Sequence, residues 1–431
     1  MKRALLAALS LLPALLLGLE AHAQAPVIQI SGANFKPLPL AVSAPRVADE
    51  GVKAAAATFD DGLLFDLSAA GVFQVLDRKS FLSDPKEGMS AATIDFSRWA
   101  NVGADALVKT QLTLANGQLQ GDLKLFTVSS GTEIFHVSHA VPQANPRALA
   151  HFFADALYKQ FTHEPGPFQS RLVFVRKSAD GKDVWISDWD GRDAHRLTSG
   201  GINVLPALIA KEAGAAFTTF RAGKPEIWAQ AEGGKAKPLI QSGNMATGVA
   251  YSPDGRHIAY SSAQGEGTQI MVANADGHGA HAITKTSYFL NTSPAWSPDG
   301  KQLAFVSNRA GSPQIYLMKA DGSGVRRLTF QGNYNQTPSW SPRGDLIAFT
   351  ARDERNAFDL FTIDVESGKV TRLTQDQGNN EEPTFAPNGR LIIFSSNRTG
   401  TSRLFVMTAD GTNPWQLPAQ AGALTTPDWG R

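Results

Sequence analysis

From about residue 171 onward, short apolar runs alternate with turn residues, and one arrangement of them recurs. The stretch "SPAWSPDGKQLAF" begins at Ser293, "PSWSPRGDLIAF" at Pro338 and "PTFAPNGRLIIF" at Pro383. In each stretch, two apolar runs flank a turn that ends in glycine, a residue that adopts the positive φ of tight hairpin turns at no steric cost. The pattern predicts a β-hairpin at each of these places.

The hairpins belong to a longer repeat. The residues that open its copies are Pro206, Val249, Pro294, Pro338, Pro383 and Pro427, at spacings of 43, 45, 44, 45 and 44 residues. A full copy has four apolar segments, which in the copy at Pro294 are Ala295–Ser297, Leu303–Ser307, Gln314–Lys319 and Arg326–Thr329. Four short antiparallel strands per repeat of this length are typical of one blade of a β-propeller.

The two ends of the repeat region complete each other. The segment 171–201 supplies the second, third and fourth strands of a blade, and "ALTTPDWGR" at the C-terminus supplies only a first strand. Separate hairpin domains would leave both sheet edges open, whereas ring closure pairs them. We therefore expect an all-β six-bladed propeller over residues 171–431, closed by the C-terminal strand. We interpret Trp296, Trp340, Phe385 and Trp429 as packing residues between blades, with stacking on a ligand as the alternative.

Residues 24–163 carry no such repeat and predict a small α/β domain, followed by a linker over 164–170. Strands are expected over 36–42 and 71–77, and a three-strand meander over 106–141 with turns at Asn116-Gly117 and Ser130-Gly131. Apolar residues at helical spacing predict a helix from Ala48 to Ala69. A second helix is expected from Asn145-Pro146 to about Phe161, with asparagine as its N-cap.

The first 23 residues have the pattern of a secretory signal peptide. Lys2 and Arg3 precede an apolar run from Ala4 to Leu19, and Ala21-His22-Ala23 forms a cleavage site of small residues. The alternative is a membrane anchor, but the run has 16 residues and contains Pro13, whereas a spanning helix needs about 20. We expect cleavage and an exported protein without membrane insertion.

Charge and composition exclude several classes of function. The chain has 40 basic and 39 acidic residues, and removal of residues 1–23 leaves 38 of each. A neutral chain without a basic cluster is a poor candidate for binding nucleic acid. The chain has no cysteine, which excludes thiol nucleophiles and thiolate metal sites.

Candidate catalytic groups are few. Asp-Gly turns place carboxylates in most blades, at positions where the residue type is explained by turn chemistry rather than by metal binding. His278 and His281 have no carboxylate partner at ligand spacing, and no G-x-S-x-G motif occurs. The adjacent acids Glu381-Glu382 and Asp353-Glu354 could suit glycoside chemistry, but neighbours on one strand point to opposite faces.

The geometry of a propeller predicts where a partner binds. The Asp-Gly turns all fall on one face, which we call the turn face. The opposite face, here the loop face, carries longer connections such as "TSYFLNT", "GNYNQT", "GNNEE" and "GNMATG", which lead into each inner strand. These connections are rich in polar and aromatic residues, a composition that suits protein recognition. We therefore expect binding on the loop face.

The signal peptide, the α/β domain and the six "SPDG…IAF…DG…RLT" units together resemble the TolB family, the periplasmic component of the Tol-Pal system of Gram-negative envelopes. The resemblance covers the whole chain after the signal peptide. It implies a non-enzymatic adaptor that binds the lipoprotein Pal through the loop face and the inner-membrane protein TolA through the start of the mature chain. It also implies contact with other outer-membrane proteins, a role in outer-membrane integrity and support of envelope constriction at cell division.

The resemblance also assigns positions in this sequence. Thr292 matches a Pal-contact position most directly, and Met245 stands near a position where family members carry a histidine. The full set expected at the Pal face is Met245, Ala246, Thr247, Phe289, Asn291, Thr292, Tyr334, Asn335, Gln336, Asn380, Glu381 and Glu382. The set expected to contact TolA is Gln24, Pro26, Val27, Ile28 and Ile30.

Two alternatives remain open from the sequence. An exported hydrolase or lyase would need carboxylates or histidines that converge in the central channel of the propeller. A binder of cell-wall fragments would need aromatic and polar residues converging there. We expect no cofactor, and the sequence leaves open whether a calcium ion lies in the channel.

Overall fold

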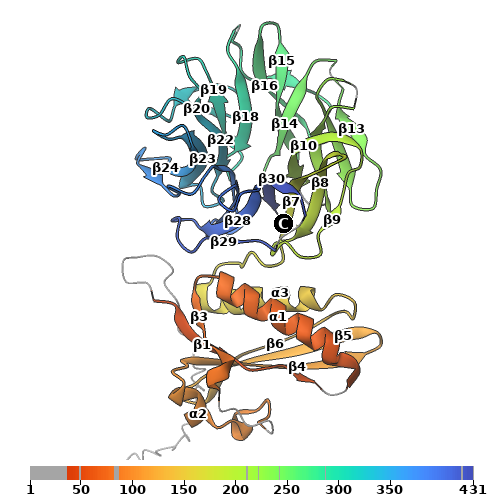
Figure 1. Ribbon diagram of the computed structural model, residues 1–431, viewed down its shortest axis with the longest axis vertical. Coiled ribbons are helices and arrows are strands. Elements are labelled where there is room, and N and C mark those ends of the chain that lie inside the picture. Colours follow the sequence, from red (N-terminus) through yellow and green to blue (C-terminus); the bar gives the residue numbers. More distant parts are fainter. Residues whose placement is uncertain are drawn as a thin grey trace, which may run out of the picture.

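The computed structural model describes residues 36–47, 50–81, 87–209, 212–221, 223–241, 243–286, 288–418 and 421–430. An N-terminal α/β domain lies beside a β-propeller (Figure 1). The signal peptide expected over residues 1–23 and the stretch Gln24–Ile30 expected to contact TolA lie outside the described residues. Within the described ranges, no helix is long and apolar enough to cross a membrane.

The N-terminal domain is built on one mixed sheet with the strand order β3-β1-β4-β5-β6. Its strands are β1 (Leu38–Val42), β2 (Arg46–Val47, paired with β4), β3 (Phe73–Val75), β4 (Ala106–Ala115), β5 (Gln118–Thr127) and β6 (Thr132–Pro142). The predicted meander is confirmed as β4, β5 and β6, and its first turn places Asn116 and Gly117 at positive φ. β1 lies parallel to both β3 and β4.

Two long helices cover the face of this sheet that is turned toward the propeller (Figure 1). Helix α1 (Lys53–Ala69) begins later than the predicted Ala48, because Glu50–Val52 form a 3-10 turn instead. Glycine at position 51 disfavours the α-helix there. Helix α3 (Pro146–Thr162) begins as predicted, and the Asn145 side chain accepts a hydrogen bond from the backbone N–H of Ala148. A shorter helix, α2 (Phe96–Asn101), contributes Trp99 to a separate cluster on the other part of the domain.

The propeller has six four-stranded blades, of which blades 1 and 2 are joined into one sheet by a short parallel contact between β8 and β10. The strands of each blade are given in order from the inner strand outward. Blade 1 has β30 (Ala423–Gly430), β7 (Arg171–Ser178), β8 (Gly181–Asp188) and β9 (His195–Arg196); blade 2 has β10 (Gly201–Leu208), β11 (Gly214–Thr219), β12 (Glu226–Ala231) and β13 (Lys237–Ile240). Blade 3 has β14 (Ala246–Tyr251), β15 (His257–Gln264), β16 (Gly267–Asn274) and β17 (His281–Ala282). Blade 4 has β18 (Asn291–Trp296), β19 (Gln302–Ser307), β20 (Gln314–Lys319) and β21 (Arg326–Arg327); blade 5 has β22 (Asn335–Trp340), β23 (Leu346–Arg352), β24 (Phe358–Asp364) and β25 (Val370–Arg372). Blade 6 has β26 (Asn380–Phe385), β27 (Leu391–Ser396), β28 (Arg403–Thr408) and β29 (Trp415–Gln416).

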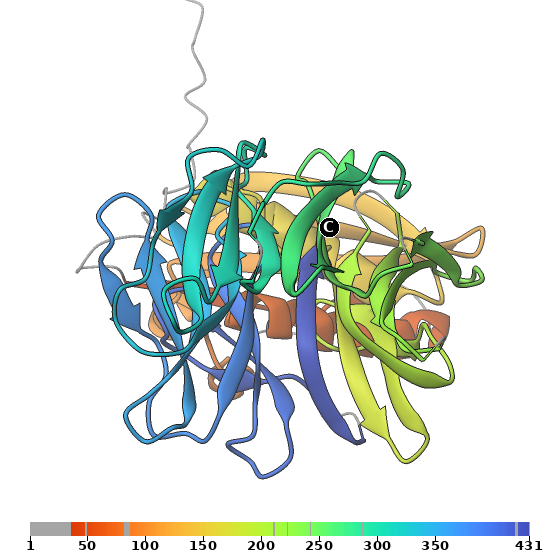
Figure 2. The same cartoon turned by 90° about the horizontal axis from the view of Figure 1, so that it is seen from above.

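The C-terminal strand closes the ring, as the sequence predicts. β30 pairs antiparallel with β7, with Leu424 opposite Arg176 and Trp429 opposite Leu172. Figure 2 shows β30, in dark blue, between the yellow-green strands of blade 1 and the lighter blue strands of blade 6. The first strand of blade 1 thus comes from the opposite end of the chain, and both sheet edges are paired.

A buried polar motif joins successive blades. Between blades 4 and 5, the Thr329 hydroxyl donates to Gln314 Oε1 at 2.8 Å and accepts from the Ile315 N–H at 2.9 Å, and the Asn335 amide donates to the same Gln314 oxygen at 2.8 Å. The equivalent sets are Thr198, Asp183 and Asn203; Thr284, Gln269 and Asn291; Thr374, Asp359 and Asn380.

This motif corrects two predicted boundaries in blade 4. The fourth strand ends at Arg327 rather than Thr329, because the Thr329 hydroxyl replaces a backbone acceptor for the ladder. The inner strand begins at Asn291 rather than Ala295, since the buried amide of Asn291 fixes the backbone where the chain enters the blade.

The aromatic residues that mark the repeat pack between blades, which confirms their interpretation. The indole N–H of Trp296 donates to the Ala250 carbonyl of the preceding blade at 3.2 Å. Phe385 packs in a cluster with Ala348 and Leu360 of blade 5. Trp340 packs in a cluster with Ala304 of blade 4, and Trp429 packs in one with Ile393 of blade 6.

Candidate partner-binding face and central channel

Every inner strand bends at the same place, which shapes the central channel. In each blade the register against the second strand shifts at a β-bulge, and two inner residues stand opposite one. The first bulge residue lies in the left-handed region, at φ between 45° and 63°: Leu205, Gly248, Ser293, Thr337, Glu382 and Thr426. Only blade 3 has glycine there, so five blades hold a side chain in a conformation that costs about 1–2 kcal/mol per residue.

Side chains from neighbouring blades hold several bulges. The N–H of Gly248 donates to the Thr218 hydroxyl at 3.1 Å, and that of Glu382 donates to the Thr350 hydroxyl at 3.0 Å. The N–H of Thr426 donates to the Glu382 carboxylate at 2.6 Å. The strained conformation is therefore fixed by contacts between blades rather than within one strand.

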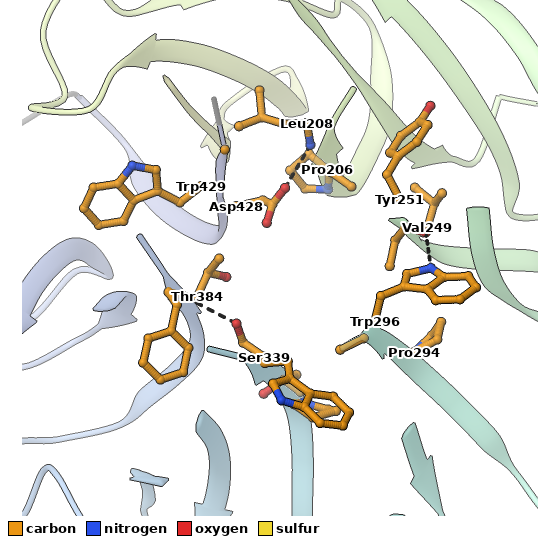
Figure 3. A pocket seen from close by; sticks show the side chains of 18 of the residues that line it. Pro206, Leu208, Val249, Tyr251, Pro294, Trp296, Ser339, Thr384, Asp428 and Trp429 are labelled. Atoms are coloured by element: carbon orange, nitrogen blue, oxygen red, sulfur yellow. Dashed lines mark hydrogen bonds between the residues drawn. The ribbon is translucent and has the colours of Figure 1, made fainter. Parts of the chain in front are cut away.

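The six bulges surround a pocket of about 870 Å³, the central channel, whose wall is formed by residues from all six inner strands (Figure 3). Most of the wall is proline, alanine and aromatic residues, and several of the polar side chains that reach it bond to the backbone of a neighbouring blade. Asp428 accepts from the Leu208 N–H at 2.9 Å, Ser339 accepts from the Phe385 N–H at 3.3 Å, and Thr384 donates to the Pro427 carbonyl at 3.0 Å.

The acidic groups of the channel lie on the side of blades 6 and 1. Burial raises the pKa of Asp428 and of Glu382 above the usual range of a carboxylate. Both carboxylates accept backbone N–H groups of neighbouring strands. In the part of the chain that the structure describes, no group of three or more histidine and acidic side chains is placed to hold a metal ion.

The loop face carries an arc of exposed apolar side chains over blades 2 to 5. Phe330 is 73% exposed and Tyr288 is 70% exposed. The members of this apolar arc are Ile202, Leu205, Phe220, Met245, Tyr288, Phe289, Leu290 and Phe330. Leu205 lies at the bulge in the middle of β10, and Ile202 lies near the start of the same strand. The other members lie in connections that enter an inner strand or join the second and third strands.

The turn face is partly covered by the N-terminal domain, so the two faces differ in what they offer a partner. Glu164, just after α3, accepts from the Arg390 guanidinium of blade 6 at 2.7 and 3.0 Å. Phe65 of α1 packs against Trp189 of blade 1 and Trp415 of blade 6.

The centre of this domain interface is polar. The Asp66 carboxylate accepts from the Trp189 indole at 3.1 Å and lies 2.7 Å from His151 Nδ1, and Arg147 of α3 pairs with Asp190. Burial raises the pKa of Asp66 to about 6. Burial also opposes the charge on His151, but the carboxylates of Asp66, Asp190 and Asp188 together outweigh it and raise the pKa of His151.

Comparison with known proteins decides the family. The profile described as "TolB amino-terminal domain" matches residues 26–134, and the profile described as "TolB beta propeller domain" matches residues 158–431. The chain belongs to the TolB family. It is 62% identical over 429 residues to the Tol-Pal system protein TolB of Myxococcus xanthus, covering 100% of this chain and 98% of that protein.

Further TolB proteins support the assignment. The TolB of Anaeromyxobacter dehalogenans (strain 2CP-C) is 45% identical over 346 residues, which is 80% of this chain and 79% of that protein. The crystal structure of TolB from Acinetobacter baumannii superposes with a TM-score of 0.78 over 94% of this chain and 98% of that one, at 23% identity. At that identity the superposition supports the fold alone.

The residues expected at the Pal face of a TolB protein fall into three groups here. Met245 and Phe289 are exposed members of the apolar arc. The half-buried group is Thr247, Thr292, Tyr334, Gln336, Glu381 and Glu382. The buried group is Ala246, Asn291, Asn335 and Asn380.

The three asparagines of the buried group correct the expected set. Their amides bond within the propeller, so they position the loops and present no surface to a partner.

Sequence reasoning missed several exposed residues of this TolB chain. Tyr288 and Leu290 flank the expected Phe289, and Phe330 follows the "RLT" of blade 4. Ile202 and Phe220 lie on blade 2, whose degenerate repeat drew no site prediction. The available signal was an apolar residue in a connection where the other copies of the repeat carry a polar one.

Proposed function

We propose that this TolB protein is a non-enzymatic periplasmic adaptor that binds Pal through the loop face of the propeller. The start of the mature chain, Gln24–Ile30, binds TolA. Through both contacts the protein maintains outer-membrane integrity and supports envelope constriction during cell division. Membership of the TolB family supports this role in general, and the apolar arc supports the choice of face.

The apolar arc is the observation that carries the proposal. Large exposed apolar side chains gathered on one face of a soluble protein mark an interaction site more often than chance exposure does. Aromatic residues are enriched at the centres of protein interfaces, and the arc supplies Phe220, Tyr288, Phe289 and Phe330. Because the N-terminal domain packs on the turn face, the loop face can take a partner without displacing it.

The alternatives with a site in the channel have less support. A hydrolase or lyase needs a carboxylate that can reach its substrate, but Asp428 and Glu382 are engaged by backbone N–H groups. A binder of cell-wall fragments needs polar groups that face the bound sugar. In the channel wall, Thr384 and Ser339 instead hydrogen-bond to the backbone of the neighbouring blade.

Calorimetric titration with the soluble domain of Pal from the same organism tests the proposal. We expect binding that Phe330→Arg and Thr292→Arg abolish or weaken at least tenfold, because a charge is placed in an apolar contact. Val325→Arg is the matched control: Val325 is 40% exposed but lies in a turn of blade 4 on the turn face, so binding should be unchanged.

A second titration, with the soluble C-terminal domain of TolA, tests the other contact. Deletion of residues 24–30 from the mature chain should abolish TolA binding and leave Pal binding intact. Absence of Pal binding by the unaltered protein would overturn the proposed function.

A further inference from the structure

Three blades carry an arginine at the same place after their second strand, and one of the three behaves differently. The sequences there are "NRAG" at 308–311 in blade 4, "NRTG" at 397–400 in blade 6 and "FRAG" at 220–223 in blade 2. Ser307, Ser396 and Thr219 each pair with the first asparagine of the inner strand. Arg309, Arg398 and Arg221 each follow two residues later and are equivalent positions.

In blades 4 and 6 the arginine turns inward. Arg309 donates to Asn291 Oδ1 at 2.8 Å and to the Ser307 hydroxyl at 3.0 Å. Arg398 donates in the same way to Asn380 Oδ1 at 2.7 Å and to the Ser396 hydroxyl at 2.9 Å. Each guanidinium also lies over an aromatic ring of the third strand, 4.9 Å from Tyr316 and 4.6 Å from Phe405.

In blade 2 the arginine turns outward. Arg221 donates to the Ser199 carbonyl at 2.8 Å and lies 5.4 Å from the ring of Trp228, the equivalent aromatic residue. The two acceptors that its counterparts use, Asn203 Oδ1 and Thr219 Oγ1, are buried and have no hydrogen-bond partner among the residues that the structure describes.

The orientation of the Asn203 amide is fixed. Its nitrogen donates to the carbonyls of Lys182 and Gly200 and to the Asp183 carboxylate. A flipped amide would face these three acceptors with its oxygen, so Oδ1 must point toward the position that an inward arginine would take.

A single residue explains why blade 2 differs. Asn308 and Asn397 precede the inward arginines, and their side-chain oxygens accept from the N–H groups of Leu290 and Asn379 at 2.8 and 2.7 Å. These bonds tie the connection between strands two and three to the connection that enters the blade. Phe220 stands at this position in blade 2, makes no such bond and is 40% exposed as a member of the apolar arc.

We propose that Arg221 has a second, inward position on Asn203 Oδ1 and Thr219 Oγ1, and that a protein partner which covers Ile202 and Phe220 on the loop face drives it there. The inference rests on the proposed function, because it assigns blade 2 as the adjustable part of the partner-binding face. The partner it fits presents apolar side chains to Ile202 and Phe220 and a hydrogen-bond donor to the Ser199 carbonyl that Arg221 leaves.

Two opposing effects act on the inward position of Arg221. The inward position satisfies two buried acceptors, whose lack of a partner destabilises the outward state. It also removes the guanidinium from water, and burial lowers the pKa of Arg309 and Arg398, which already occupy that position. A partner that excludes water from Phe220 and takes the Ser199 carbonyl removes the advantage of the outward position.

Hydrogen exchange of the arginine Nε–H groups, followed by ¹⁵N NMR on the full mature chain, measures the position directly. Arg309 and Arg398 are internal references for the inward state and should exchange slowly with and without the soluble Pal domain. Arg221, assigned through Arg221→Lys, should exchange fast in the free protein and slowly in the complex. Fast exchange in both states, with Pal bound, overturns the inference and leaves the proposed function standing.

Substitution of the acceptor supplies a second, independent arm. Thr219→Val should leave the melting temperature of the free protein unchanged or raised, whereas the equivalent Ser307→Ala should lower it, since only Ser307 holds an arginine there. Thr219→Val should weaken Pal binding about tenfold, the loss expected for one hydrogen bond to a charged group, and Thr219→Ser should not. Equal Pal affinity of Thr219→Val and the unaltered protein contradicts the inference.

Phe220→Asn separates the two proposals. It restores the "NRAG" sequence of blade 4, and Arg221 should then exchange slowly in the free protein, without any partner. If Pal does not bind, the proposed function fails, and this variant alone decides whether the inward position exists. Fast exchange of Arg221 in the Phe220→Asn variant would show that the inward position does not exist.

Discussion

The indole of Trp189 in blade 1 donates to the Asp66 carboxylate of α1 at 3.1 Å, and this bond joins the propeller to the N-terminal domain. Both side chains are fully buried. Around them, the rings of Phe65, Phe168 and Trp415 pack against Trp189. The interface therefore has a polar centre inside an aromatic surround, and the polar centre fixes how the two domains meet.

Loss of the indole donor should destabilise this interface. Trp189→Phe leaves Asp66 without one of its two hydrogen-bond partners in a buried site, and we expect the free energy of unfolding to fall by about 1–3 kcal/mol. Urea denaturation followed by circular dichroism measures the change. Trp185→Phe is the control, since Trp185 is half-buried beneath Arg176, and a loss as large as that of Trp189→Phe would contradict the assignment.

The same cluster predicts how stability depends on pH. The folded protein raises the pKa of Asp66 from 3.8 to about 6 and that of His151 above 6.5. Each group therefore binds its proton more tightly when folded, so its contribution is full below the unfolded pKa and is lost as pH rises through the folded pKa. For His151 this loss begins above pH 6.5.

We expect the urea midpoint of the unaltered protein to fall as pH rises above neutrality. The charged groups that act on His151 are Asp66 on α1 and Asp188 and Asp190 in blade 1, and Arg147 on the same helix as His151 acts on Asp66. His151→Gln should flatten the decline, and an unchanged slope in that variant would assign the effect to other groups.

The ring of bulges makes two reciprocal predictions. Gly248 has φ 63° and open space where a Cβ would lie, so Gly248→Ser should cost about 1–2 kcal/mol through backbone strain alone. Ser293 has φ 53° at the equivalent position of blade 4. Ser293→Gly should stabilise, by less, because glycine also gives the unfolded chain more freedom. Thermal denaturation checks both, and effects of the same sign would show that backbone strain does not decide them.

The polar motif between blades predicts that substitution of Thr329 lowers the stability of the protein. Thr329→Val keeps the shape but removes the acceptor of the Ile315 N–H and a donor to Gln314. We expect the free energy of unfolding to fall by about 1–3 kcal/mol. Thr371, exposed on β25, is the matched control, and Thr371→Val should change stability by less than about 0.5 kcal/mol.

The fold could be predicted because the same sequence features recur in each blade. Asp-Gly and Asn-Gly turns, apolar alternation and the spacing of the copies specify hairpins locally, and the incomplete blades at both ends specify the closure. The partner-binding residues could not be predicted as well. Asn291 and Tyr288 occur three residues apart in one polar connection, yet Asn291 is buried and Tyr288 is exposed. The amide of Asn291 bonds to Thr268 and Gln269 of the preceding blade and to Thr286 at the start of the same connection, and these contacts distinguish it from Tyr288.

The domain interface escaped prediction for a different reason. Asp66, His151 and Trp189 lie on three elements far apart in the sequence, and no period relates them. A buried aspartate on an otherwise apolar helix face was the only available signal. The role of this aspartate, Asp66, could be interpreted only once the position of blade 1 was known.

The pairing of β30 with β7 also sets the order of events when the protein is made. Leu172 finds its partner Trp429 only after more than 250 further residues have been added, so the ring cannot close before β30 is made. Blades 2 to 6 can form as they emerge, but blade 1 and the Trp429 side of the domain contact need β30. Every chain that stops short of β30 presents an open β-edge at β7, where the strand of another chain can pair.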